Sequence, residues 1–235
     1  MSLHPLEGAF ERLRRGEEHL TDLRQRLADV LRQQEESIAP YFDPDPPHRI
    51  KLTLPTRTFV TMRVGILIGE ICYNLRSALD YLVFELAKLD SGAPQDGTQF
   101  PIEDSPKGFS HRVKTSRLKG INAAHVAAIE GLQPYNGCHW TKALRDLSNP
   151  DKHREFPNIG GDVTAHAFSP TEDRNFVDIQ APIRRATHPV LGEMDVKVHF
   201  TGRIQFADGA PIIETLELIK VKVADTLTAF KGEFT

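Results

Sequence analysis

The amino-acid sequence predicts an α+β protein in which a helical bundle is followed by an antiparallel β-sheet and a closing helix. Three observations support this class. Apolar residues recur at steps of three and four through two long segments of the first half. They alternate with polar residues in several segments after Gly161, and they return to helical spacing after Pro211. Because helices come first and strands later, the pattern is typical of an α+β fold.

Two long helices are expected to organise the bundle. The first runs from Pro5 to about Ser37, with a narrow apolar stripe and with Arg, Glu and Gln between the apolar positions. The central helix begins between Thr58 and Val64 and stops before Ser91. A narrow stripe on so long a helix indicates that the first helix lies along another long helix, and the central helix is the natural partner.

The central helix also carries aromatic residues on the face opposite its apolar stripe. Tyr73, Tyr81 and Phe84 lie there among polar residues. We therefore expect the helix to be covered on both sides, either by another layer of the fold or by a second copy of the chain. Arg76 and Asp80, four residues apart, are expected to pair.

Shorter elements connect and follow these helices. Residues 40–48 contain four prolines and are expected to form a linker or an extended connection, and a short strand is predicted near 49–54. Three short helices are then expected, and their sequence signals are Pro106 at a first helical position after Ser105, Asn122 as the cap of a helix over 121–129, and an apolar pattern over 141–147.

The second half of the chain predicts a half-buried antiparallel sheet. Its expected strands are residues 163–168, 176–183 and 194–206, which alternate between apolar and polar residues. The last helix, after Pro211, is expected either to pack on this sheet or to rejoin the bundle. We expect a bundle over 1–156, and a sheet with the C-terminal helix over 157–235, packed together as one globular unit.

Composition excludes several classes of protein. The net charge of −3 gives no overall attraction to nucleic acid, so phosphate binding would depend on a local cluster of cations. Two cysteines, Cys72 and Cys138, cannot form a disulfide framework, and no metal-binding motif is present, so we expect neither a metal nor a cofactor. No secretory signal and no apolar run of roughly 20 residues is found, which indicates a cytoplasmic protein outside membranes.

The densest polar cluster outside the central helix is the candidate site. It consists of Arg145, Asp146, Asn149, Asp151, Lys152, His153 and Arg154. A histidine among cations suits phosphate chemistry, since His transfers protons near pH 7 and Arg or Lys stabilises charge on a phosphoryl oxygen. The alternative is structural, because cations at a helix C-terminus also satisfy its dipole and its carbonyl groups.

Four sequence motifs resemble a widespread group of uncharacterised bacterial proteins. The motifs are Asn74-Leu75-Arg76-Ser77-Ala78-Leu79-Asp80, Phe100-Pro101-Ile102, Leu132-Gln133-Pro134-Tyr135 and the stretch from Leu147 to Arg154. More distantly, the chain resembles the HEPN superfamily of helical bundles. That superfamily includes metal-independent endoribonucleases of toxin and antiphage systems as well as non-catalytic nucleotide or RNA binders.

The resemblance implies roles for individual residues. His153 would deprotonate a ribose 2′-hydroxyl, Arg145 or Arg154 would stabilise the anionic transition state, and Asn149 would orient the histidine or the phosphate. The supporting or binding residues would be Asn74, Arg76, Asp80, Asp151 and Lys152, and a homodimer would bring two clusters together. The HEPN pattern places an Arg one residue before the polar residue, where this chain has Ser148, and Arg145 stands farther from His153 than in that pattern.

A non-catalytic module that binds RNA, a nucleotide or a protein is the second hypothesis. In it, the polar residues of the central helix and of the cluster form a satisfied network that leaves no group for a substrate. The sheet would then provide the interaction surface, with Lys197, His199, Arg203 and the pair Arg184-Arg185 available to an acidic partner.

Overall fold

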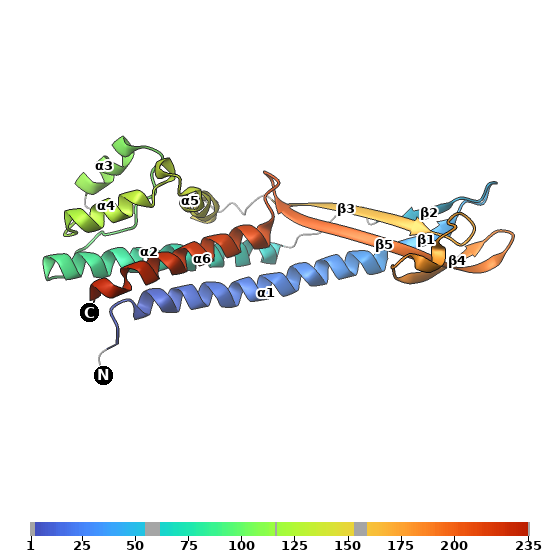
Figure 1. Cartoon of the computed structure of the whole chain (residues 1–235), viewed down its shortest axis with the longest axis horizontal. Helices are drawn as coiled ribbons and strands as arrows, with labels where there is room; N and C mark the ends of the chain where they lie inside the picture. Colours follow the sequence, from blue (N-terminus) through green and yellow to red (C-terminus); the bar gives the residue numbers. More distant parts are fainter. Residues whose placement is uncertain (1–2, 55–61, 116, 153–158, 235) are drawn as a thin grey trace. The chain divides into compact units, whose positions relative to one another are not determined.

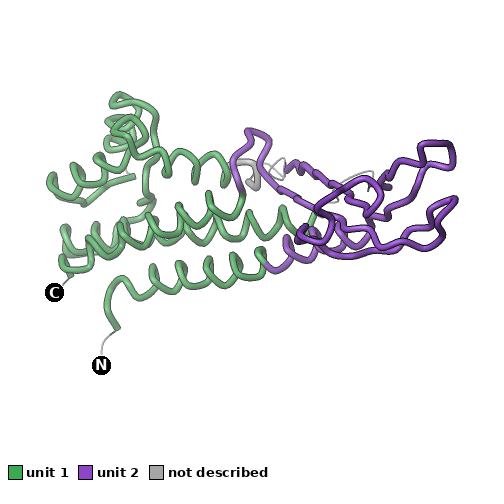
Figure 2. The backbone as a smooth tube through the Cα atoms, turned by 45° about the vertical axis from the view of Figure 1, so that its right-hand side comes forward, with its two compact units in different colours: residues 1–24, 62–157, 212–235 green, residues 25–61, 158–211 purple. Residues whose placement is uncertain are grey.

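The predicted α+β class is confirmed by a computed structural model of the chain (Figure 1). The structure describes residues 3–54, 62–115, 117–152 and 159–234, with the side chains of residues 149–152 left out. The chain forms two compact units, shown in different colours in Figure 2. Unit 1 comprises residues 1–24, 62–157 and 212–235, and unit 2 comprises residues 25–61 and 158–211.

Unit 1 is helical. Its helices are the first part of α1 (Glu7–Ser37), α2 (Met62–Ser91), α3 (Pro106–Lys114), α4 (Ala123–Gly131), α5 (His139–Lys152) and α6 (Ile212–Phe230), with single 3₁₀ turns η1 (Pro134–Asn136) and η3 (Lys231–Phe234). The apolar stripe of α2 is buried along its whole length, from Val64 to Leu86. Helix α2 is therefore the centre of the core of this unit.

Helix α1 lies along α2 in unit 1, as the sequence predicts, and the two helices run antiparallel. A Cβ atom placed on Gly8 would lie 2.9 Å from the Tyr81 ring, and one on Gly16 would lie 3.3 Å from Leu75 Cδ2. Between these two glycines, the Arg12 guanidinium lies 5.8 Å from the centre of the Tyr81 ring. The small residues therefore let the two helices approach closely.

The helix caps follow the sequence signals. The Ser105 side chain accepts a hydrogen bond from Gly108 N, with Pro106 at the start of α3. The Asn122 side chain accepts one from His125 N at 2.9 Å. Each of these bonds satisfies an amide group that the first turn of a helix leaves without a partner, so both predicted starts are confirmed.

Unit 2 is built on β-structure. Strands β1 (Ala39–Phe42) and β2 (Ile50–Thr53) form an antiparallel pair, and β3 (Ile159–Phe168), β5 (Gly192–Phe206) and β4 (Ile183–His188) form an antiparallel sheet in that order. A single 3₁₀ turn, η2 (Phe176–Asp178), precedes β4. The core consists mainly of Ile38, Phe42, Ala186, Val196 and Val198. The predicted alternation in β5 thus places Val196 and Val198 in this core, with Phe200 packed against it.

Two expectations for unit 2 need correction. Residues 39–42, in part expected to be a linker, form strand β1, because Ile38 and Phe42 are buried beside the sheet. Residues 176–183 were expected to be a strand, but they form η2 and a loop, and the strand begins only at Ile183. Here Lys197 Nζ donates to the carbonyls of Phe176 at 2.7 Å and of Val177 at 3.0 Å. A side chain thus satisfies carbonyl groups that a neighbouring strand would otherwise bind.

The division of the chain differs from the expected split near residue 156. Helix α6 belongs to unit 1, where it packs on α2, because its apolar face is buried there at Leu216, Ile219 and Val223. Lys220 of α6 also forms an ion pair with Glu17 of α1 at 2.9 Å. The sequence left open whether the last helix packs on the sheet or rejoins the bundle, and the structure shows that it rejoins the bundle.

Replacing Gly202 by alanine is expected to destabilise unit 2. The added Cβ would lie 2.5 Å from Leu31 Cδ2 and 2.9 Å from the Phe200 ring, so both side chains must move. Overpacking of this kind costs about 1–3 kcal/mol. The matched control is Gly160→Ala on the neighbouring strand, where the Cβ meets no atom within 4 Å. Equal denaturation midpoints for the two variants would contradict the prediction.

Candidate functional site

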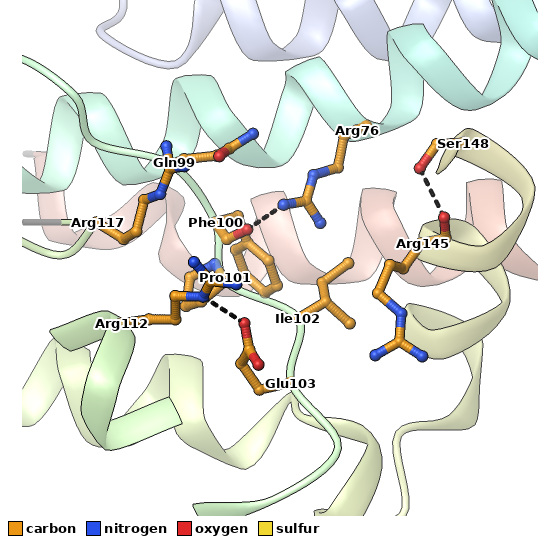
Figure 3. Close-up of a pocket in the computed structure, with 10 residues that line it drawn as sticks. All are labelled: Arg76, Gln99, Phe100, Pro101, Ile102, Glu103, Arg112, Arg117, Arg145 and Ser148. Atoms are coloured by element: carbon orange, nitrogen blue, oxygen red, sulfur yellow. Dashed lines mark hydrogen bonds and ion pairs between the residues drawn. The ribbon is translucent and has the colours of Figure 1, made fainter. Parts of the chain in front are cut away.

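A pocket of about 210 Å³ in unit 1 is rich in arginine (Figure 3). Its lining residues are Arg76 of α2, the loop residues Gln99, Phe100, Pro101, Ile102 and Glu103, Arg112 of α3, Arg117 from the loop after α3, and Arg145 and Ser148 of α5. Only one of these residues, Glu103, carries a negative charge.

One wall of the pocket is the loop between α2 and α3, which α2 holds at two points. Phe100 N donates a hydrogen bond to Asp80 Oδ1 at 2.9 Å. The Arg76 guanidinium donates to the Phe100 carbonyl, as Figure 3 shows. Arg76 Nε and Asp80 Oδ1 lie 3.8 Å apart, which confirms the predicted pairing of these two residues. Together they fix the extended backbone at Phe100, which is fully buried.

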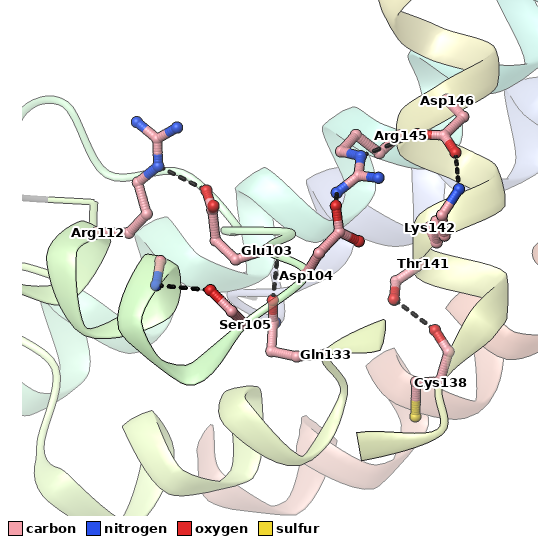
Figure 4. Close-up of polar contacts among 11 residues, drawn as sticks. Glu103, Asp104, Ser105, Arg112, Gln133, Cys138, Thr141, Lys142, Arg145 and Asp146 are labelled. Atoms are coloured by element: carbon pink, nitrogen blue, oxygen red, sulfur yellow. Dashed lines mark hydrogen bonds and ion pairs between the residues drawn. The ribbon is translucent and has the colours of Figure 1, made fainter. Parts of the chain in front are cut away.

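Gln133, which follows α4, holds the same loop from the other side. This side chain is completely buried, and its Nε2 donates to the Pro101 carbonyl at 3.0 Å and to the Ile129 carbonyl at 3.1 Å. Its Oε1 accepts a bond from Glu103 N at 2.9 Å, a contact drawn in Figure 4. One amide side chain therefore satisfies three backbone groups of two elements and sets the position of Glu103.

Arg76 is a largely buried cation of the pocket, with only 14% of its side chain exposed. Burial lowers its pKa, Asp80 opposes that change, and the nearby Arg117 and Arg145 add to it. Among the described residues, its partners are only the Phe100 carbonyl and Asp80. A guanidinium has five N–H donors, so Arg76 keeps donors for a group inside the pocket.

The other arginines differ in how their charge is balanced. Arg112 Nε donates to Glu103 at 2.6 Å. No ion pair joins Arg117 to any residue in the described ranges. Each of these side chains is extended toward the loop in Figure 3. Arg117 is therefore the cation with the greatest freedom to meet an anion.

Arg145 bridges α5 and the loop. Its Nη1 lies 2.9 Å from Asp104, and its Nε lies 2.9 Å from Asp146 (Figure 4). Burial acts to lower the pKa of Arg145, but the hydrogen bonds to these carboxylates outweigh it and the pKa is raised. Lys142 in turn pairs with Asp146 at 2.5 Å. Arg145 is thus held firmly in its cationic form.

This arrangement can bind an anion. The carboxylates that pair with Arg76 and Arg145 do not line the pocket, so the cavity itself faces mainly cations. Planar guanidinium groups match the oxygens of phosphate and carboxylate and bind them with paired hydrogen bonds. Among the described residues, no group of His, Cys, Asp and Glu is placed to hold a metal ion.

The structure brings part of the predicted site together. Arg76 and Arg145 line one pocket, and Asp80 supports it from behind. Asn74 does not take part, because it is buried and bonded elsewhere: its Nδ2 donates to Glu70 O of α2, and its Oδ1 accepts from Arg12 of α1. Asn149, Asp151 and Lys152 belong to the last turns of α5, with side chains outside the described part, and His153 and Arg154 lie outside the described residues.

Sequence reasoning missed several residues of the site. Arg112 and Arg117 stand in a segment without a motif, and no role was predicted for Gln133. A signal was available for Gln133, since it stands in one of the four quoted motifs. Of the cations expected on the sheet surface, Lys197 and Arg184 bind backbone carbonyls, those of η2 and of Glu35 and Glu36.

Tyr135, in the turn that follows Gln133, is expected to make the stability of the protein depend on pH. Burial and a hydrogen bond to Glu130 at 2.8 Å raise the pKa of Tyr135 from 10 to about 12. The neutral phenol is therefore favoured by folding, so its contribution to stability is complete below pH 10 and is lost as the pH rises toward 12. An absorbance titration of phenolate should show a phase near pH 12 that Tyr135→Phe removes and Glu130→Gln shifts to lower pH. A Tyr135→Phe titration that keeps this phase would contradict the assignment.

The fold and the pocket define an α+β protein with an arginine-lined pocket in its helical unit. Among the described residues, no helix has the length and apolar character needed to cross a membrane. Comparison with models of protein families, with curated proteins and with solved structures gave no match. The pocket therefore has to be interpreted from its own chemistry.

Proposed function

We propose that unit 1 binds RNA and places a backbone phosphate in the arginine pocket. The observation that carries this proposal is Arg76, a buried cation whose pKa is lowered by burial and whose free donors have no described protein partner. A phosphate would supply the missing acceptors and offset the cost of burying the charge. The small volume, about 210 Å³, suits a phosphate better than a whole nucleotide.

RNA is a better candidate than a small anion because of the surface of α2 beside the pocket. Tyr73 is 55% exposed and stands three residues before Arg76, on an adjacent part of the helix. Exposed aromatic rings next to cations are typical of surfaces that bind single-stranded nucleic acid, where bases stack on the rings. The Arg12 guanidinium of α1 lies 5.8 Å from the centre of the Tyr73 ring, and a base attached to the bound phosphate would stack on the exposed part of that ring.

RNA cleavage is the second candidate, and the position of Arg145 favours it. This residue lines the pocket and lies on the helix that leads to His153. By the HEPN resemblance, His153 would take the proton of a 2′-hydroxyl, which attacks the adjacent phosphorus. The products would be a 2′,3′-cyclic phosphate and a 5′-hydroxyl, and the arginines would stabilise the transition state. The homodimer that the resemblance implies would use the part of the α2 surface that carries Tyr73 and Tyr81, which are 55% and 41% exposed.

Binding is tested with a short fluorescent single-stranded RNA in EDTA. Arg117→Gln should weaken binding about tenfold, the effect expected for one lost hydrogen bond to a charged group. It should also reduce the slope of log affinity against log salt by about one. The control is Arg14→Gln, because Arg14 is 65% exposed on α1 and away from the pocket. Equal affinities of the two variants would exclude the pocket as the binding site.

Cleavage is followed in the same samples by gel analysis. Cleavage in EDTA that His153→Ala abolishes, with unchanged RNA binding and thermal stability, would establish a metal-independent ribonuclease. Binding without cleavage would establish the non-catalytic module. A stable protein that neither binds nor cleaves RNA would show that the polar cluster is a structural network.

A further inference from the structure

A second pocket in unit 1 has the opposite electrostatic character. Its volume is about 640 Å³, and it lies where the C-terminal ends of α2 and α6 meet α4, at one end of the unit in Figure 1. Its walls are mainly apolar, with Ala124, Ala128, Leu132 and Phe230 among them. Its polar groups are Asp90, Asn122, His125, Thr226 and Glu233, and no lysine or arginine is among its described lining residues.

His125 is the central polar group of this pocket and is only 8% exposed. Its Nδ1 lies 2.8 Å from Asp90 Oδ2 and 3.1 Å from Asn122 Nδ2. The shorter contact, to a carboxylate oxygen that can only accept, assigns the proton to Nδ1. Asp90 also accepts hydrogen bonds from Asn122 N and Asn122 Nδ2, each at 2.8 Å. Asp90 therefore holds the imidazole in one orientation and leaves Nε2 as the other functional nitrogen.

In neutral His125, Nε2 is an acceptor that faces another acceptor. Glu233 Oε2 lies 3.5 Å away, and no hydrogen bond from a described residue reaches Nε2. Two acceptors at this distance need a donor between or beside them, which is either a second proton on the ring or a ligand with N–H groups. The Glu233 side chain is 54% exposed, so this end of the pocket is open to a ligand.

The surroundings favour a cation. Helix C-termini carry partial negative charge, and both α2 and α6 end at the pocket, where Asp90 and Phe230 line it. Helix α6 has no basic residue in its last turn, and Lys88 in the last turn of α2 pairs with Glu85 at 3.5 Å. The N-terminus of α4 also reaches the pocket, where Asn122 caps it and donates to Asp90. An alkyl chain would find apolar walls beside this electronegative end.

We propose that this pocket binds a primary alkylammonium group. Its N–H donors bind His125 Nε2 and Glu233, and its alkyl chain lies against Ala124, Ala128 and Phe230. The site requires neutral His125, because an imidazolium would repel the ammonium and would fill the gap before Glu233 with its own proton. The charged and titratable groups that face His125 are Asp90 from α2 and Glu233 from η3.

The experiment is a calorimetric and NMR titration of the full chain with n-butylamine. Saturable binding is expected, at least about tenfold tighter than that of n-butanol, the neutral analogue of similar size. Glu233→Gln should weaken it about tenfold. Glu11→Gln, at a carboxylate that is also 54% exposed but pairs with Arg14 on α1, should leave it unchanged. Equal binding of butylamine and butanol, or equal affinities of the two variants, would overturn the proposal.

Absence of saturable butylamine binding would also overturn the site and would assign the Asp90–His125–Glu233 chain to fastening η3 onto α4.

Discussion

Gln133→Ala is expected to lower the free energy of unfolding of unit 1 by about 3–5 kcal/mol, because it removes buried hydrogen-bond partners. The substitution leaves Glu103 N and the carbonyls of Pro101 and Ile129 without the bonds they now make to a side chain that is 0% exposed. Chemical denaturation followed by circular dichroism measures the loss. The same variant should also bind RNA more weakly, since the loop that forms one wall of the pocket is no longer fixed.

The control for this prediction is Asn136→Ala in the same turn. Asn136 makes one exposed side-chain bond, to Glu130 O at 2.8 Å, so its loss should cost no more than about 1 kcal/mol. If the two variants were equally stable, Gln133 would not be the residue that joins the α4 turn to the loop.

Asp80→Ala is expected to cost about 2–4 kcal/mol, because it leaves a buried cation without its carboxylate. Arg76 is 14% exposed and has Asp80 as its carboxylate partner among the described residues, and Phe100 N would also lose its acceptor. Asp80→Asn should cost less, because its amide oxygen still accepts from Phe100 N. Denaturation curves of the two variants and of the wild type give the comparison.

The RNA affinity of the Asp80→Asn variant gives a second test of the role of Asp80. In Asp80→Asn, Arg76 no longer shares its charge with a carboxylate, so a phosphate in the pocket should be held more tightly than in the wild type. Weaker binding by a folded Asp80→Asn variant would show that the carboxylate orients Arg76 and that this orientation matters more than the competing charge.

Local signals in the sequence were sufficient for the helices and for the strands β2, β3 and β5. The apolar stripe of α2, the cap residues Ser105 and Asn122 and the alternation in β5 all report on neighbours within a few residues. The spacing of Arg76 and Asp80 belongs to the same kind of information, because residues four apart on a helix are adjacent in space. These predictions depend on periodicity and capping, which tertiary contacts did not override here.

Tertiary structure decided what periodicity does not encode. Residues 176–183 alternate as a strand would, but Lys197 satisfies the carbonyls at 176 and 177, and the strand begins later. In the pocket, Arg112 and Arg117 join Arg76 only because the loop at Phe100 is fixed by α2 on one side and by Gln133 on the other. The sequence by itself therefore determined the α+β class, the central helix and the pairing within it. The convergence of four arginines depends on hydrogen bonds between residues 20 to 32 positions apart, and only the folded chain brings those residues together.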